Sequence, residues 1–528
     1  MLEASLVTLN AHVITLNPEK PTAQAIAILD GKIINVGSNK QIRKHVGKNT
    51  RVINAKGKTV VPGLTDCHVH MTGFGGFQQS LNLRGVKSIR EIQRKLKKHA
   101  RDHPESAWIL GGQWDQEQLR EKRYPTRWNL DKAVADRPVF LRRVCGHVAV
   151  ANSKALQLAG MTAEKAAENG DADVDGKTGQ LNGILREKAS ELVDKAIPKP
   201  TEEELKKTCL LACEKAIENG LTCVHWLVES PEEMRAIQQL HFEEKLPLRV
   251  FLGIETEQID ELIRFGLLTG FGDDMLKIGF IKVFADGSLG GHTAALKEPY
   301  TDKPESCGML LKTQAELDEL VSKAHSAGLR LGIHAIGDRA VEAALKAYEK
   351  ALRSNPRIDH RHRVEHCSVL NPKLIVQMKR LGLVASVQPH FVVSDFWVAD
   401  RVGKTRARWV YPFKTLLREG LVVVSGSDCP VEPISPILGI WAAAARKSIP
   451  EENLTVEEAL ETYTVNAAYA SFDESKRGTI ETGKLADLTI LSDDPFTVKP
   501  DNIRKIKAEM TIIGGNVEYE DKKRKTTD

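Results

Sequence analysis

The 528-residue sequence is poor in aromatic residues, at 5%, and contains no long apolar run. No stretch approaches the roughly 20 apolar residues that a transmembrane helix needs, so we expect no membrane partner. Residues 1–20 alternate like a strand and lack the apolar stretch of a signal peptide. The eight cysteines include no CxxC pair, which is typical of free thiols in a reducing cytoplasm.

An excess of one charge is also missing. The chain has 75 basic and 70 acidic residues, a net charge of +5, and the two signs are interspersed. A nucleic-acid-binding protein concentrates basic residues on one face, so we expect no nucleic-acid partner. The one basic run, residues 522–525, is typical of a solvated tail.

The central part of the chain alternates between short apolar stretches and helical stretches. Strands that alternate with helices indicate right-handed βαβ units and a parallel sheet. Eight such strands predict an α/β fold, a closed (β/α)8 TIM barrel, whose catalytic residues lie at the C-terminal ends of the strands. The eight stretches are residues 60–70, 221–225, 248–252, 278–285, 329–334, 362–366, 384–388 and 421–427.

The two ends of the chain carry hairpins instead. Residues 25–36 contain an Asp-Gly turn and residues 510–518 a Gly-Gly turn. Neither piece is long enough to bury a core alone. Both therefore predict one composite β-sandwich domain, built from residues 1–60 plus 478–528.

The gap between the first two barrel strands predicts an insertion domain at residues 76–210, which leaves 61–75 plus 211–477 for the barrel. An insertion after a barrel strand begins on the catalytic face. We therefore interpret it as a lid that shapes the pocket of a small-molecule substrate. The alternative is a peripheral role in oligomer contacts, for example in a homodimer.

Two histidines of the first strand, His68 and His70, are two residues apart. Their side chains therefore point to the same face, as two ligands of one metal ion would. Taken alone, the pair is equally compatible with a chance pair of surface histidines. Other potential ligands follow at the ends of further predicted strands, where residues of such barrels are typically catalytic. They are Lys282, His334, His366 and Asp428.

The sequence resembles the amidohydrolase superfamily, and within it the YtcJ-like branch (amidohydrolase family 3), which is related to N-substituted formamide deformylase. The resemblance covers essentially the full length. Besides the six candidate ligands it includes residues 112–115, 143–147, 152–156, 286–289, 388–389 and 478–488. One position departs from the pattern: Trp226 stands where the family usually has Asp after the second-strand histidine.

The resemblance implies two divalent metal ions, expected to be Zn²⁺. His68, His70 and Asp428 would hold one ion and His334 and His366 the other, with carboxylated Lys282 as the bridging ligand. Lys282 must be neutral to react with carbon dioxide, and burial in a barrel interior lowers a lysine pKa.

These residues favour hydrolysis of a non-peptide C–N bond in an amide, formamide or cyclic amide through a metal-activated hydroxide. Asp428 would be catalytic, passing a proton to the leaving nitrogen. One alternative is a mononuclear aminohydrolase that deaminates a heterocycle, but that branch usually carries Glu where Gly337 stands here. A non-catalytic scaffold is the third hypothesis, and the six competent ligands count against it.

Further candidates are residues that could bind the substrate and residues that could orient the ligands. Trp114, Arg143 and His147 in the insertion are candidate substrate-binding residues, and Arg143, with Arg142, could bind a carboxylate. A structural role is at least as compatible with each. Asp338 and Glu365 are expected to orient His334 and His366, respectively, rather than to bind metal.

Overall fold

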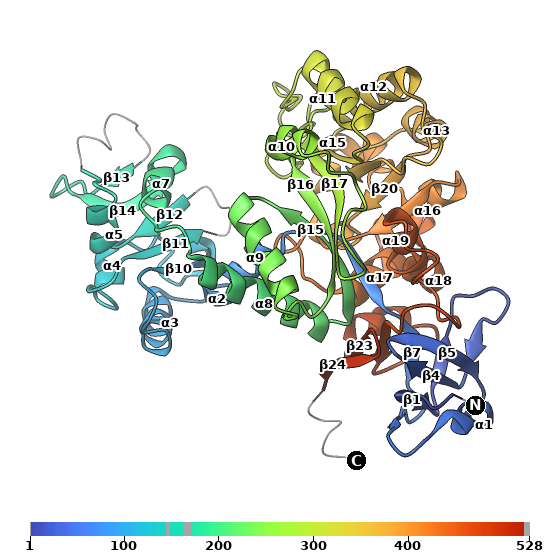
Figure 1. The fold of residues 1–528 in the computed structure, drawn as a ribbon. Helices are drawn as coiled ribbons and strands as arrows, with labels where there is room; N and C mark the ends of the chain where they lie inside the picture. Colours follow the sequence, from blue (N-terminus) through green and yellow to red (C-terminus); the bar gives the residue numbers. More distant parts are fainter. Residues whose placement is uncertain (1, 144–147, 163–171, 522–528) are drawn as a thin grey trace. The chain divides into compact units, whose positions relative to one another are not determined.

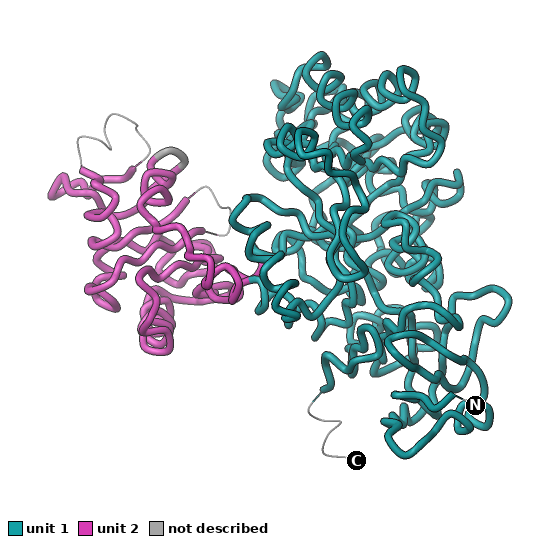
Figure 2. The backbone as a smooth tube through the Cα atoms, in the orientation of Figure 1, with its two compact units in different colours: residues 1–72, 209–528 teal, residues 73–208 magenta. Residues whose placement is uncertain are grey.

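The computed structural model describes residues 2–143, 148–162 and 172–521 (Figure 1). The chain divides into two compact units, one made of residues 1–72 and 209–528 and the other of residues 73–208 (Figure 2). Among the described residues, no helix is both long and apolar enough to cross a membrane.

The larger unit contains an eight-stranded sheet in which neighbours along the chain pair in parallel. Both faces of the early strands are buried, as expected when helices cover a parallel sheet. The sheet is nearly closed, which confirms the predicted TIM barrel. Its strands are β8 (Leu64–Val69), β15 (Leu221–Val228), β16 (Arg249–Glu255), β17 (Leu276–Phe284), β18 (Leu331–Ala335), β19 (Arg363–His366), β20 (Val384–Val387) and β21 (Val422–Ser425).

Helices connect these strands and surround the sheet (Figure 1). They are α8 (Glu202–Glu218), α9 (Pro231–Phe242), α10 (Ile259–Arg264), α11 (Gln314–Ser326), α12 (Asp338–Ser354), α13 (Pro372–Arg380), α14 (Phe391–Ser394), α15 (Val398–Ala407), α16 (Phe413–Arg418), α17 (Pro436–Ala445), α18 (Val456–Thr462) and α19 (Val465–Ala470).

The two ends of the chain form two further sheets in the same unit. A four-stranded sheet contains β1 (Leu6–Leu9), β4 (Ala25–Leu29), β5 (Lys32–Gly37) and β6 (Arg51–Asn54). A six-stranded sheet contains β2 (His12–Ile14), β3 (Thr22–Ala23), β7 (Thr59–Pro62), β22 (Leu488–Leu491), β23 (Ala508–Ile513) and β24 (Asn516–Glu520). In the β4–β5 hairpin, Asp30 and Gly31 both have positive φ, 49° and 73°, as a type I′ turn requires.

Strands from the two ends of the chain share one sheet and one apolar core. β7 and β22 pair antiparallel, with Val61 opposite Thr489. One buried cluster includes Ile26 of the four-stranded sheet and Val60 and Ile490 of the six-stranded sheet. The boundary of a separate sandwich domain, at 1–60 plus 478–528, stays a prediction, because these strands belong to the same compact unit as the barrel.

The smaller unit has its own six-stranded sheet and its own apolar cores. The strands are β9 (Leu81–Asn82), β10 (Ile109–Trp114), β11 (Val139–Arg143), β12 (Val148–Ala151), β13 (Ala172–Val174) and β14 (Leu181–Arg186). Helices α3 (Ile89–Asp102), α4 (Arg127–Asp131), α5 (Ser153–Leu158) and α7 (Glu187–Asp194) belong to it, and α2 (Met71–Gln79) leads into it. Its role as a lid stays a prediction.

Candidate metal centre

Three of the expected ligands lie together where the barrel strands end. His68 belongs to β8, His70 follows it, and Asp428 follows β21. The potential ligand atoms of all three lie within 4.8 Å of one another. Asp428 Oδ1 is 3.4 Å from Nε2 of each histidine. Two imidazoles and a carboxylate in this arrangement can hold one divalent ion.

The backbone around these ligands is tightly held. The Asp428 N–H donates to the His68 carbonyl at 2.7 Å, which joins the end of the last strand to the first. The buried Asp66 carboxylate accepts from the N–H groups of His68, at 3.1 Å, and Ser427, at 3.0 Å. Asp428 and His366 also have left-handed φ values of 57° and 73°. Such backbone costs about 1–3 kcal/mol per residue and is concentrated at functional sites.

His334 and His366 lie beside this group. Their ring centroids are 4.3 Å apart, and the His366 ring is 4.9 Å from that of His68. Burial lowers the pKa of His334 to about 3. Burial, with neighbouring His334, also holds the pKa of His366 well below its usual range. Both rings are therefore neutral, which is the form that binds a metal ion.

Lys282 lies at the centre of the same group. Its side chain is buried, and Nζ is 3.1 Å from Nε2 of His68. Burial lowers the pKa of Lys282 to about 8, although the carboxylates of Glu365 and Asp428 act in the opposite direction. A substantial fraction of this amine is therefore neutral near physiological pH.

Asp286, two residues after β17, has backbone partners rather than Lys282. The Asp286 carboxylate instead accepts from the backbone N–H groups of Ala295, Ile336 and Gly337 at 2.8–3.0 Å. It therefore shapes the loops that follow β17 and β18.

Three of the four candidate-ligand histidines share one pattern: Nδ1 contacts a side-chain oxygen, which makes Nε2 the nitrogen that could bind a metal ion. Such contacts fix the ring orientation and the tautomer of metal-binding histidines. The Nδ1 contacts are His68 to Glu365 at 2.6 Å, His70 to Glu229 at 2.7 Å and His366 to Gln388 at 2.7 Å.

Both carboxylates that were expected to orient a histidine have other partners. Glu365 contacts His68 rather than His366, and Nδ1 of His366 contacts Gln388 instead. Asp338 begins α12 and accepts from the Lys297 N–H at 2.9 Å. His334 contacts the Gly287 carbonyl at 3.0 Å instead.

Sequence reasoning missed Glu229 as a functional residue, and it gave Gln388 no role. Gln388 belongs to the family-like Gln-Pro pair, so a signal for it was present. Glu229 directly follows β15, so its position at a strand end was the available signal.

The candidate substrate residues lie in the smaller unit or outside the described residues. Trp114 is completely buried in the core of that unit and donates to the Leu141 carbonyl at 3.0 Å, which leaves no surface for a substrate. Arg143 pairs with Asp115 at 2.9 Å, and Arg142 pairs with Asp194 at 2.5 Å. A substrate role for Arg143 stays a prediction. His147 lies outside the described residues.

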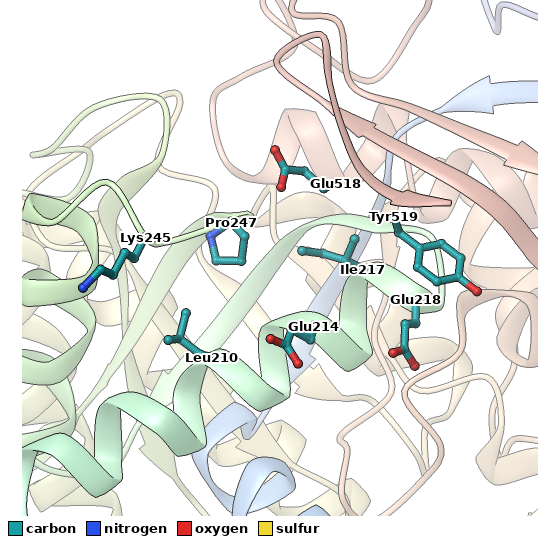
Figure 3. Close-up of a pocket in the computed structure, with 8 residues that line it drawn as sticks. All are labelled: Leu210, Glu214, Ile217, Glu218, Lys245, Pro247, Glu518 and Tyr519. Atoms are coloured by element: carbon teal, nitrogen blue, oxygen red, sulfur yellow. The ribbon is translucent and has the colours of Figure 1, made fainter. Parts of the chain in front are cut away.

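A pocket of about 380 Å³ in the larger unit is not the active site (Figure 3). Residues of α8 and β24, including Glu214, Glu218 and Tyr519, line it. Lys245 and Pro247 complete the lining and precede β16, at the N-terminal end of that strand. Catalytic residues of such barrels lie at the opposite, C-terminal ends.

Comparison with known proteins identifies the family. The amidohydrolase family matches residues 51–519. The chain is 35% identical to the protein YtcJ of Bacillus subtilis, over 96% of this chain and 98% of the relative. It is 27% identical to N-substituted formamide deformylase of Arthrobacter pascens, over 98% of each chain. A crystal structure of an uncharacterized metal-dependent hydrolase from Pyrococcus furiosus matches with a TM-score of 0.80 and 34% identity, over 93% of this chain and all of the other. The chain therefore belongs to the amidohydrolase family and is a hydrolase that acts on carbon–nitrogen bonds other than peptide bonds.

Proposed function

We propose that this protein is a zinc-dependent hydrolase of a small amide, formamide or cyclic amide. His68, His70 and Asp428 would hold one ion and His334 and His366 a second, with carboxylated Lys282 between them. The observation that carries the proposal is the convergence of His68, His70 and Asp428, with ligand atoms within 4.8 Å of one another, at the strand ends where such barrels have their active sites.

The residues present fit such ions. Imidazole and carboxylate are ligands that zinc favours. His334 and His366 are neutral, and partners at Nδ1 orient His68, His70 and His366. An ionised Asp428 beside two imidazoles supplies the negative charge that balances a dication. Metal binding requires two changes at these ligands. The contact between Lys282 Nζ and Nε2 of His68 must be replaced, and His70 must lose a proton. Burial alone would lower the His70 pKa, but hydrogen bonds with Asp428 and Glu229 raise it to about 9.

A bound ion would supply Lewis acidity, which lowers the pKa of a water molecule and polarises a carbonyl group. Asp428 would hold the attacking water, take its proton and deliver it to the leaving nitrogen. Burial alone would raise the Asp428 pKa, but hydrogen bonds with His68 and His70 outweigh burial and hold it well below its usual range. Asp428 is therefore ionised and able to accept a proton.

Lys282 would enter the site as a carbamate. Its neutral amine attacks carbon dioxide, a new N–C bond forms, and one proton leaves the nitrogen. The product is an anion with two oxygens in place of a cation. This change replaces repulsion between an ammonium group and the metal ions with attraction, and it gives the side chain ligand atoms that a lysine lacks.

The formamide part of the proposal rests on the full-length likeness to N-substituted formamide deformylase. Against the deaminase alternative, a Cβ atom added at Gly337 would lie 2.0 Å from the Ala295 carbonyl oxygen. A glutamate, which the deaminase branch usually carries there, does not fit this backbone. This observation favours amide hydrolysis over deamination.

The experiment is a metal analysis followed by a substrate panel. Elemental analysis of purified protein should give two zinc ions per chain. The panel contains N-formyl amines, N-acyl amino acids, cyclic amides and amino-substituted heterocycles, with release of formate, amine and ammonia measured separately. Asp428→Asn is the control, with hydrolysis lost. Ammonia release from heterocycles without hydrolysis of any amide would support the deaminase instead, and metal-free protein would contradict the proposal.

A further inference from the structure

Trp226, which departs from the family pattern, faces away from the barrel interior. It is completely buried, and its indole N–H donates to Oε1 of Glu233 at 2.6 Å. Its neighbour His225 faces inward, where Nδ1 contacts Arg363 at 2.7 Å. The two residues follow the alternation of β15, so Trp226 belongs to the layer between β15 and α9.

Glu233 is a buried carboxylate on which three donors converge. Oε1 accepts from Trp226 and from the Thr72 hydroxyl, and Oε2 accepts from the backbone N–H of Glu229 at 2.8 Å. Glu233 is only 3% exposed. A buried carboxylate needs this number of partners, so the orientation of Glu233 is fixed by β15, by the first turn of α2, which carries Thr72, and by Glu229, the residue that follows β15.

Glu229 connects Glu233 to the metal centre. Its carboxylate is half exposed, and Oε1 accepts from Nδ1 of His70 at 2.7 Å. Because Glu233 accepts from the backbone N–H of Glu229, the backbone of Glu229 is held in place and its side chain is positioned next to His70. Trp226, Glu233, Glu229 and His70 thus form one connected set of hydrogen bonds.

We infer that Glu233 is a positioning residue of the metal centre, which holds Glu229 so that Glu229 fixes the orientation and tautomer of His70. The inference rests on the proposed function, since it assumes that His70 binds metal. It assigns a role to Trp226 as well: the indole occupies one carboxylate oxygen of Glu233 and leaves the other for Glu229.

A purely structural role for Glu233 must be separated from this one. Glu233 is also the third residue of α9, and its own N–H is capped by Ser230 Oγ at 3.1 Å. Ser230→Ala removes that cap without touching the contacts of the Glu233 carboxylate. It is therefore the matched control for loss of helix stability alone.

Glu233→Gln tests this set of hydrogen bonds because an amide has only one acceptor oxygen. Its NH2 group must face either the indole N–H of Trp226 or the N–H of Glu229, and neither can accept. In Trp226→Phe/Glu233→Gln the indole donor is gone, so the NH2 group can face the Thr72 hydroxyl, which can accept. The amide oxygen then accepts from Glu229, and the double variant should recover what the single variant loses.

The measurement is retention of zinc by the metal-loaded proteins during dialysis against a series of chelator concentrations. A cobalt-substituted sample of each protein reports ligand geometry through its visible absorption. We expect Glu233→Gln to bind metal about 10- to 100-fold more weakly, as changes next to metal-binding histidines typically do, and to alter the cobalt spectrum. Ser230→Ala should keep wild-type affinity and spectrum with a lower melting temperature.

The outcomes are distinct. Wild-type protein without metal would contradict the proposed function itself. Wild-type affinity and spectrum in Glu233→Gln, or a double variant as weak as the single one, would overturn the positioning role while leaving the function intact. If Glu233→Gln does not fold, two other variants test the positioning role. Trp226→Phe/Glu233→Gln should retain metal, and Glu229→Gln should bind metal as weakly as is expected for Glu233→Gln.

Discussion

Nδ1 of His68 lies 2.6 Å from Oε2 of Glu365, and both side chains are completely buried. Glu365 also forms an ion pair with the buried Arg363 at 2.7 Å. Burial alone would raise the Glu365 pKa, but the charge of Arg363 and the hydrogen bond from His68 outweigh burial and hold it well below its usual range. One carboxylate therefore serves both the barrel core and a candidate metal ligand.

Glu365→Gln should damage both stability and metal binding. The Arg363 guanidinium would stay buried without an anionic partner, which typically costs about 3–5 kcal/mol. Chemical denaturation should show this loss, and elemental analysis should show less bound metal. Because the folded-state pKa of Glu365 is lowered, its stabilising contribution is present above the usual carboxylate pKa and is lost as the pH falls through the lower, folded value.

The control for this change is Glu342→Gln. Glu342 pairs with Lys297 at 2.8 Å, and both side chains are more than a third exposed. Exposed pairs contribute about 0–1 kcal/mol, so this variant should be close to wild type. An equally small effect of Glu365→Gln would show that the buried pair is not needed by the fold or the site.

Gly337→Ala should strongly destabilise the loop after β18. A Cβ atom there would lie 2.0 Å from the Ala295 carbonyl oxygen, so backbone must move. The same movement would disturb the contact between the Gly337 N–H and Asp286. We expect a lower melting temperature and weaker metal retention, measured by calorimetry and elemental analysis.

Gly290→Ala is the matched control, since an added Cβ there makes only ordinary contacts, at 3.6 Å, with Trp397. It should behave like wild type. Full stability in Gly337→Ala would remove the steric argument against a glutamate at this position, and with it one reason to reject the deaminase.

The sequence was sufficient to predict the barrel because each parallel strand is an apolar run with a helix after it. The positions of His68, His70 and Asp428 followed from this, since strand ends meet at one face of a barrel. The hydrogen-bond partners of these ligands could not be predicted in the same way. Glu365 and Glu229 come from β19 and from the end of β15, and which of them meets which histidine depends on how neighbouring strands are offset along the barrel.

Trp114 shows a second limit of the sequence. A tryptophan next to glycines and polar residues is compatible with a binding surface, but the sheet of the smaller unit turns its side chain into a core. Whether an aromatic residue is buried depends on which face of its strand meets other apolar residues. That information lies in distant segments of the chain.

A histidine pair on the N-terminal side of the barrel should make stability sensitive to acid. The Asn355 carbonyl can only accept, so His325 donates to it through Nε2, at 2.6 Å. The Leu331 N–H can only donate, so His362 accepts through Nδ1, at 3.1 Å. His362 Nε2–H must then donate to His325 Nδ1, at 2.9 Å. Both rings are neutral in this chain of hydrogen bonds.

Burial lowers the pKa of both histidines, that of His362 well below its usual range. Below about pH 6.5 the unfolded chain therefore binds protons that the folded protein excludes, and stability falls by up to about 1.4 kcal/mol per pH unit for each histidine. His362→Gln keeps one donor and one acceptor but cannot titrate. Its stability, measured by denaturation from about pH 7.5 to about pH 5.5, should fall less steeply than that of wild type.

His12→Gln removes a histidine outside this pair, the partner of Asp494 at 3.1 Å, and its slope is the reference for the loss of one histidine elsewhere. An unchanged slope in His362→Gln would show that His362 is not the acid-sensitive group. The comparison between variants is needed because the metal-site histidines also take up protons in acid.

The carbamate at Lys282 gives the sharpest prediction. An ammonium group 3.1 Å from Nε2 of His68 would repel a metal ion bound there, whereas a carbamate would attract it. Lys282→Ala should therefore lose most activity and at least one metal ion per chain. Acetate or propionate should restore part of both by filling the space left by the side chain. Lys282→Arg should not be rescued, because its guanidinium stays charged and occupies that space.

Direct observation of the carbamate separates this role from a structural one. Protein exchanged with ¹³C-labelled bicarbonate should show one enriched carbamate carbon in the NMR spectrum, absent from Lys282→Ala. The amine must be neutral to react, and burial holds the Lys282 pKa at about 8, so labelling should become faster as the pH rises towards that value. A plain lysine in metal-loaded protein, with one ion per chain and no labelled carbon, would remove the bridge and favour a mononuclear site.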